Sequence, residues 1–304
     1  MDGGHCFNRK VEMSNNYPHI LSRDCIKEFE NKGFVVTPGV IDARELAAFN
    51  VAVDAEVTRR TVHDHRVVHE KTTYEQSFVQ CMRLWETSPE VLPLTCHAGM
   101  AGVAAQLLQV DGVRLWQDQA LYKEAGGRET TPHQDQTFWP IGYEPLISAW
   151  IPFDDVTVEN GAMAYVPGSH KTGRLRVVDI THGTDPYDIL NDPVLGGAKL
   201  ETVEVPAGSV IWHHGLTVHA AYPNKSTRPR RVFTIVYISA TAKRQRKWTA
   251  YPLDRDGVAV GEVIQGPGMP VLWPAPTTLP VPPKAVGVLV GPQVRPPDGA
   301  DRAQ

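Results

Sequence analysis

Hydrophobic positions in the first third of the chain recur at helical spacing, between residues that favour helix starts and stops. Ser22-Arg23-Asp24 offers an N-cap, and Gly33 is a typical stop. The pattern predicts a helix between these points, a short strand over 34–36, a second helix from 42 to about 60, and a third from 88 to about 109.

From residue 113 the pattern changes to short apolar segments separated by Gly, Pro, Asn and Asp. Segments rich in β-branched and aromatic residues predict strands over 113–122, 133–139, 146–153, 162–167, 200–205, 209–213 and 231–239. No helical crossovers connect them, so they indicate an antiparallel sandwich or barrel. We therefore expect a mainly β fold with flanking helices. The long polar insertion at 170–198 is typical of a lid or binding loop.

A length of 304 residues would allow two domains of about 150 residues each. The order of the predicted elements favours one domain over 21–265, with a helical part at 21–110 and a β core at 111–240. Residues 1–20 are predicted to be a disordered leader. Residues 266–304 hold ten of the 25 prolines, which predicts an extended arm or a disordered tail.

Composition and charge exclude several classes of protein. The chain is 42% hydrophobic and 21% charged, as in ordinary globular proteins, and its net charge of −4 gives no basic field for nucleic acid or an anionic membrane. Apolar runs are too short for a membrane span, and no signal-peptide core is present. Four scattered cysteines without a CxxC pair indicate reduced thiols. We expect a cytoplasmic protein, monomeric by default, that binds neither nucleic acid nor membrane.

The segment Thr131–Trp139 carries the strongest chemical signal. His133 and Asp135 are two residues apart, so on a strand their side chains would share a face. A third ligand is available within 212–219, where His219 is favoured and His213 and His214 are alternatives. Two histidines and one carboxylate on one face of a metal are the facial triad of non-haem Fe(II) oxygenases.

Arg230 strengthens this interpretation, because a short His-x-Asp motif alone is a weak signal. Arg230 follows His219 by eleven residues and leads into the apolar segment 232–238. It could therefore lie on an adjacent strand and point into the same barrel. Its planar guanidinium suits bidentate binding of a carboxylate.

With these residues in place, the sequence resembles the phytanoyl-CoA dioxygenase family of Fe(II)/2-oxoglutarate oxygenases. The resemblance runs in order from about residue 25 to about 240. The matching segments are 30–34 (ENKGF), 121–123 (LYK), 133–136 (HQDQ), 150–152 (WIP), 159–163 (ENGAM), 166–170 (VPGSH), and 219–231, which contains PNKS and RR. The resemblance implies a double-stranded β-helix, or jelly-roll, core of the cupin-like kind.

The resemblance also implies roles for individual residues. Iron would be bound by His133, Asp135 and His219, and the far carboxylate of 2-oxoglutarate by Arg230. The cosubstrate pocket would include Trp150 and, less specifically, Gln119. The family often has a serine two positions after the distal histidine, where this chain has Ala221. Either Thr217 or Tyr237 could supply the missing hydrogen bond.

The implied activity is hydroxylation of an unactivated C–H bond of a small molecule, with 2-oxoglutarate and O₂ consumed and succinate and CO₂ released. Desaturation or demethylation is also possible with this cofactor set. Substrate-pocket candidates are Phe138, Trp139 and Lys123. Two alternatives stay open: a cupin-like metalloprotein that does not use 2-oxoglutarate, and a catalytically silent binding protein on the same fold.

Overall fold

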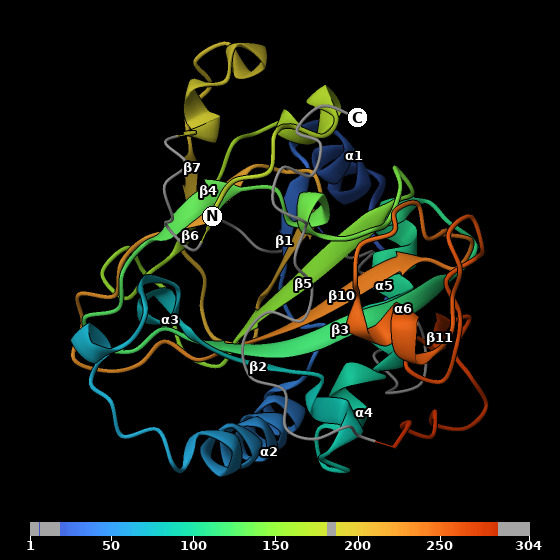
Figure 1. The fold of residues 1–304 in the computed structure, drawn as a ribbon, viewed down its shortest axis with the longest axis horizontal. Helices are drawn as coiled ribbons and strands as arrows, with labels where there is room; N and C mark the ends of the chain where they lie inside the picture. Colours follow the sequence, from blue (N-terminus) through green and yellow to red (C-terminus); the bar gives the residue numbers. More distant parts are fainter. Residues whose placement is uncertain (1–5, 7–18, 181–186, 285–304) are drawn as a thin grey trace.

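The structure, a computed structural model, describes Cys6, residues 19–180 and residues 187–284. The predicted disordered leader lies almost entirely outside the described residues, as does the part of the proline-rich tail beyond residue 284. The described helices and strands form two antiparallel sheets with helices against one of them (Figure 1). None of the described helices has the length and apolar character needed to cross a bilayer.

The helices begin and end at the residues that the sequence marks. Helix α1 (Arg23–Lys32) has Ser22 as its N-cap and ends at Gly33, whose φ of 80° lies in the left-handed region that glycine adopts without strain. Helix α2 (Ala43–Thr61) starts with a capping box between Asp42 and Glu45. The remaining α-helices are α3 (Thr73–Ser77), α4 (Leu92–Thr95), α5 (Ala98–Leu108) and α6 (Tyr251–Arg255).

The prediction of one continuous helix over 88–109 is wrong. The chain forms α4, leaves helical geometry at Cys96 and His97, and starts again as α5. The His97 side chain accepts a hydrogen bond from the backbone N–H of Met100 and so serves as the N-cap of α5. Histidine is not among the usual N-cap residues, which is why the break gave no signal in the sequence.

Seven strands form what we call the major sheet. Its order is β1 (Phe34–Thr37), β8 (Val210–His214), β5 (Leu146–Pro152), β10 (Val232–Ser239), β3 (Val113–Tyr122) and β11 (Val271–Trp273), with β2 (Val79–Met82) also paired to β3. The minor sheet has the order β4 (Thr130–His133), β9 (His219–Ala221), β6 (Met163–Tyr165) and β7 (Glu201–Val203). Every pairing is antiparallel.

Side chains alternate between the two faces of the major sheet. On β10, Phe233, Ile235 and Tyr237 belong to the apolar cluster shared with the helices, and α5 packs across β3, β5, β10 and β11. The other face packs against the minor sheet, because Trp150 and Ile211 share a cluster with residues of β6, β7 and β9. The predicted mainly β, jelly-roll architecture is confirmed, and its interior lies between the two sheets.

Four segments differ from their predictions. The strand predicted over 133–139 is wrong, because β4 ends at His133 and Asp135–Phe138 forms a 3-10 helix, η3. The proline-rich tail contributes a short edge strand, β11, which the sequence did not predict. The short strands β2 and β9 were also missed, since three or four residues are too few for a clear alternation.

The insertion at 170–198 has a small apolar cluster of its own over its described part. Val178, Ile189 and Leu195 pack there against Val166 and Val218, which flank the minor sheet. Short 3-10 helices occur in this region and elsewhere in the described chain: η1 (Val68–Glu70), η2 (Leu84–Glu86), η4 (Ser169–Thr172), η5 (Ile189–Asn191) and η6 (Pro193–Leu195). The described part of the insertion is therefore packed against the minor sheet.

Candidate metal centre

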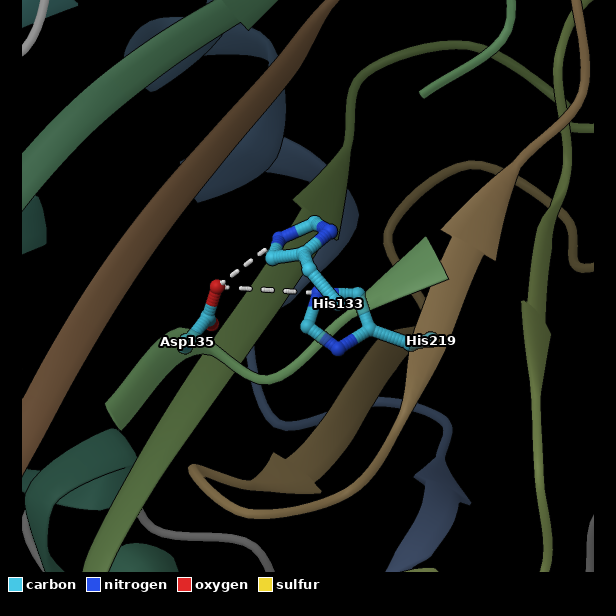
Figure 2. Close-up of side chains that lie close together, drawn as sticks. All are labelled: His133, Asp135 and His219. Carbon is cyan, nitrogen blue, oxygen red and sulfur yellow. Dashed lines mark ion pairs between the residues drawn. The ribbon is translucent and has the colours of Figure 1, made fainter. Parts of the chain in front are cut away.

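The minor sheet brings His133, Asp135 and His219 together (Figure 2). His133 ends β4 and lies opposite His219, the first residue of β9, in the strand pairing. Nε2 of His133 and Nε2 of His219 lie 3.3 and 3.6 Å from Oδ1 of Asp135. The three ligand atoms lie within 4.8 Å of one another. The sequence predicted that strand alternation would place His133 and Asp135 side by side. Instead, the turn into η3 directs Asp135 back towards the histidines.

Backbone carbonyls orient both imidazoles. Nδ1 of His133 lies 2.7 Å from the Thr131 carbonyl oxygen, and Nδ1 of His219 lies 2.9 Å from that of Thr217. A carbonyl oxygen can only accept, so Nδ1 carries the proton in each ring. Nε2 is then left with a lone pair directed at the centre of the triad.

The charges of the triad suit a cation. Burial would raise the pKa of Asp135, but the imidazoles of His219, His133 and His213 outweigh it and hold the pKa well below its usual range. Burial also lowers the pKa of His219 to about 3, despite the nearby Asp135 carboxylate. The carboxylate is therefore ionised and the His219 ring neutral near pH 7, as metal ligands must be.

Oδ2 of Asp135 points to the major sheet instead. It accepts hydrogen bonds from Ser148 Oγ and His213 Nε2, both at 3.2 Å. Ser148 and His213 are paired neighbours on β5 and β8. His213 is thus a partner of the carboxylate, outside the triad of ligand atoms. His214 accepts a hydrogen bond from the Leu216 N–H and does not enter the triad either.

Arg230 lies buried between the sheets, 3% exposed. Its Nη1 donates to the Gly161 carbonyl oxygen at 2.6 Å, and its guanidinium lies 5.0 Å from the centre of the Trp150 ring. Its Nε has no hydrogen-bond partner among the described residues. Burial lowers its pKa to about 10, so the side chain stays charged near pH 7. A buried cation with an unused donor is a site for an anion.

Trp150 belongs to a row of inward-facing residues on the major sheet, which continues with Thr234 on β10 and Gln119 on β3. Gln119 Oε1 accepts a hydrogen bond from Gln80 Nε2 at 2.7 Å. The Thr234 hydroxyl is buried and has no partner among the described residues. The structure therefore offers Thr234 as a hydrogen-bonding group near Arg230.

Neither residue suggested as a replacement for the serine at Ala221 is placed for that role. The Thr217 hydroxyl donates to the Gly33 carbonyl oxygen at 2.8 Å. Tyr237 faces the helices, in the apolar cluster on the outer side of the major sheet. Strand alternation on β10 explains this, since Thr234 and Tyr237 are three residues apart and point to opposite faces.

The substrate-pocket candidates have different surroundings. Lys123 is fully buried, and its amino group donates to the carbonyl oxygens of Ser77 and Arg128. Trp139 packs against Trp116 in an apolar cluster, with ring centres 5.9 Å apart. The ring of Phe138 lies 5.8 Å from that of His133. Of the three, Phe138 lies against a residue of the triad.

Three further residues of the site were not predicted from the sequence: Ser148, Tyr165 and Thr234. Tyr165 is buried between the sheets, and its hydroxyl lies 3.4 Å from Nδ1 of His213. Burial raises the pKa of Tyr165 well above its usual range; the negative Asp135 adds to this, and the positive Arg230 opposes it. Ser148 and Thr234 interrupt otherwise apolar strands, and this polar residue in an apolar run was the signal available.

A family comparison covers most of the chain. The model of the phytanoyl-CoA dioxygenase (PhyH) family matches residues 29–232, a range that includes the triad and Arg230. The chain belongs to the phytanoyl-CoA dioxygenase family.

Relatives in this family come from animals, plants and bacteria. A phytanoyl-CoA dioxygenase domain-containing protein 1 homolog from Caenorhabditis briggsae is 34% identical over 131 residues, 40% of this chain and 44% of the relative. A probable alpha-ketoglutarate-dependent hypophosphite dioxygenase from Stutzerimonas stutzeri is 32% identical over 43% of this chain and 47% of the relative. These matches span less than half of each relative's length.

Solved structures show the same fold over most of their length. The alpha-ketoglutarate-dependent carbocyclase SnoK from nogalamycin biosynthesis is 27% identical, with a TM-score of 0.70 over 83% of this chain and 96% of SnoK. The epimerase SnoN, solved with Fe³⁺, alpha ketoglutarate and nogalamycin RO, is 28% identical, with a TM-score of 0.67 over 82% and 97%. These findings agree with the sequence-based expectation of iron and 2-oxoglutarate as cofactors.

Proposed function

We propose that this member of the phytanoyl-CoA dioxygenase family is an Fe(II)/2-oxoglutarate-dependent oxygenase that hydroxylates a C–H bond of a small molecule. The observation that carries the proposal is the combination of two features between the sheets. One is the His133, Asp135 and His219 triad, with its lone pairs directed inward. The other is the buried Arg230, whose Nε has no partner among the described residues.

The triad would hold Fe(II) through Nε2 of His133, Oδ1 of Asp135 and Nε2 of His219. Three protein ligands on one face leave three positions open, as in the non-haem iron oxygenases. When bound there, iron with 2-oxoglutarate and O₂ supplies the oxidising power that no side chain possesses. The protein provides ligands already in the required charge state and orientation.

Arg230 would bind the distal carboxylate of 2-oxoglutarate. Its Nε and the Thr234 hydroxyl, both without a partner among the described residues, would each donate one hydrogen bond to it. Trp150 packs against the guanidinium and fixes its plane. Both donors are buried, so binding a carboxylate satisfies groups that otherwise have no protein partner.

The substrate would bind near Phe138 and the first part of the insertion at 170–198. Gln134, which lies between the two ligands of the His-x-Asp motif, accepts from the Leu175 N–H at 2.8 Å and donates to the Gly173 carbonyl at 2.9 Å. Residues 173–175 are therefore fixed beside the triad. The nogalamycin RO bound to SnoN together with Fe³⁺ and alpha ketoglutarate supports a small-molecule substrate.

An anaerobic titration tests the cofactor assignment and separates the alternatives. Adding 2-oxoglutarate to the protein with Fe(II) under nitrogen should produce a visible charge-transfer band, because the 2-oxo acid chelates the iron. A metalloprotein that does not use 2-oxoglutarate would bind Fe(II) without this band. A silent binding protein that lacks the metal site would bind neither Fe(II) nor 2-oxoglutarate. Binding of Fe(II) without the band, or no binding at all, would reject the proposal.

Product analysis with labelled O₂ tests the hydroxylation step. A hydroxylase places one oxygen atom from O₂ in the product and one in succinate. Succinate release coupled to a product without new oxygen would instead indicate ring closure, epimerisation or desaturation. SnoK and SnoN, a carbocyclase and an epimerase, make this control necessary.

A further inference from the structure

His213 differs from the two histidines of the triad in the position of its proton. Its Nε2 faces Oδ2 of Asp135 at 3.2 Å, and its Nδ1 faces the Tyr165 hydroxyl at 3.4 Å. Oδ2 also accepts a hydrogen bond from Ser148 Oγ, and because this carboxylate oxygen is an acceptor, Nε2 of His213 carries the proton. Nδ1 is then the acceptor for the Tyr165 O–H. His133 and His219 have the opposite arrangement, with the proton on Nδ1.

The two oxygens of Asp135 consequently have separate surroundings. Oδ1 faces Nε2 of both His133 and His219. Oδ2 accepts from His213 Nε2 and Ser148 Oγ, two donors that come from paired positions on β8 and β5. A carboxylate with both lone pairs of one oxygen engaged in hydrogen bonds presents only its other oxygen to a cation.

We infer that His213 is a positioning residue that keeps Asp135 a one-oxygen ligand, so that the metal retains three open positions. This inference rests on the proposed function, because it concerns the same metal centre. If Oδ2 also bound the metal, one of those positions would be filled. The bidentate 2-oxo acid and O₂ together need all three.

The surroundings hold His213 firmly in this role. The side chain is 2% exposed, and its ring lies 4.6 Å from that of His219 and 5.5 Å from that of Tyr165. Tyr165 is itself stacked on Phe34 from β1, with ring centres 4.6 Å apart. Packing therefore fixes Tyr165 and His213 in the chain of hydrogen bonds that leads to Asp135.

Replacing His213 by Phe tests the inference, since Phe keeps the ring but has no N–H donor. We expect His213→Phe to lower the affinity for Mn(II), measured by calorimetry without cosubstrate, by about tenfold or more. The visible spectrum of the Co(II) form should also change, because a second carboxylate oxygen alters the coordination. His213→Gln keeps an N–H donor and should restore most of the affinity and the spectrum.

His214→Phe is the matched control, since His214 is the adjacent residue and lies outside the triad. It should bind Mn(II) as the wild type does. Should His213→Phe fail to fold, Ser148→Ala removes the other donor to Oδ2 with a minimal change in volume. It should lower the Mn(II) affinity and shift the Co(II) spectrum in the same direction as His213→Phe.

The outcomes separate this inference from the proposed function. Wild-type Mn(II) affinity and an unchanged Co(II) spectrum in His213→Phe would overturn the role of His213 and leave the proposed oxygenase standing. Equal losses of Mn(II) affinity in His213→Gln and His213→Phe would also overturn it, because they would point to the His213 imidazole as a metal ligand. If the wild type bound neither Mn(II) nor Co(II), both conclusions would fall together.

Discussion

The minor and major sheets supply different halves of the candidate site. The minor sheet and the turn after β4 provide the three metal ligands, on strands of only three or four residues. The major sheet has strands of seven to ten residues at its centre and provides Ser148, Trp150, His213 and Thr234, while Arg230 precedes β10. The metal ligands and the anion-binding groups thus come from different parts of the fold.

This division has a structural reason. The central strands of the major sheet are covered on their outer face by helices α2, α4 and α5, so their inner face is rigidly placed. The short strands of the minor sheet are fixed by pairing and by contacts with the major sheet and the insertion. His213 links the two halves, because it belongs to the major sheet and contacts a ligand beside the minor one.

Removing a ligand beside the minor sheet should have the largest effect. We expect Asp135→Ala and His133→Ala to lower the Mn(II) affinity at least about 100-fold and to abolish substrate-dependent succinate formation. Calorimetry and succinate release measure the two effects. Asp155 is an exposed carboxylate that accepts a hydrogen bond from the Ala207 N–H. Asp155→Asn is therefore the control and should behave as the wild type does. Full activity in Asp135→Ala would refute the iron assignment.

Removing the cation beside the major sheet should separate the two halves. Arg230→Leu is expected to leave Mn(II) affinity near wild type but to weaken 2-oxoglutarate binding by about 10- to 100-fold, the value of a charge-assisted hydrogen bond. Arg230→Lys keeps the charge without the planar guanidinium, so its 2-oxoglutarate affinity should lie between those of the wild type and Arg230→Leu. Loss of Mn(II) binding in Arg230→Leu would show that the sheets are not independent.

A smaller effect is expected at Thr234, whose buried hydroxyl has no partner among the described residues. Thr234→Val should weaken 2-oxoglutarate binding by about tenfold, the lower end of the range for a hydrogen bond to a charged group. The melting temperature without cosubstrate should be unchanged or slightly higher, because a buried unsatisfied group is removed. A lower melting temperature with unchanged 2-oxoglutarate affinity would mean that the hydroxyl serves only the fold.

The smallest effect on ligand binding is expected behind the major sheet, in the helix layer, where Glu56 contributes to stability. Burial opposes the charge of Glu56, but hydrogen bonds from Arg59, Thr87 and Arg60 outweigh it and lower its pKa from 4.5 to about 2. A depressed carboxyl pKa gives stability that is present above pH 4.5 and lost as the pH falls towards 2.

Chemical denaturation at pH 6 and pH 3 measures this contribution. The wild type should lose up to about 2 kcal/mol more than Glu56→Gln between these values, and solvent screening at the exposed Arg59 lowers the contribution below this limit. Equal losses in both proteins would remove Glu56 from the account. The metal and 2-oxoglutarate affinities of Glu56→Gln at pH 7 should match the wild type.

Helix caps and long strands could be predicted from the sequence. Ser22, Gly33 and Asp42 mark their helix ends by chemistry that acts within a few residues. The strands β3, β5 and β10 show long runs of β-branched and aromatic residues. The triad was found because its residue types and order are distinctive, although the reason given for the convergence of His133 and Asp135 was wrong.

The remainder depends on contacts between distant segments. The sequence left His213 as an alternative ligand, because nothing local shows which nitrogen of a histidine carries the proton. Its role follows from Tyr165 and Asp135, each 48 or more residues away along the chain. Thr234 gave a local signal, a hydroxyl in an apolar strand, but its proximity to Arg230 depends on the register of β10 with β5.

Gln134 has a consequence for how such a site can diversify. Its amide is hydrogen-bonded to the backbone of Gly173, Leu175 and Leu216. The start of the insertion and the turn before His219 are therefore both held by one side chain that lies between two metal ligands. Beyond Leu175 the insertion has its own apolar cluster. Under the proposed function, changes in the outer part of the insertion would leave the metal ligands in place, so the substrate range could change while the reaction centre is preserved.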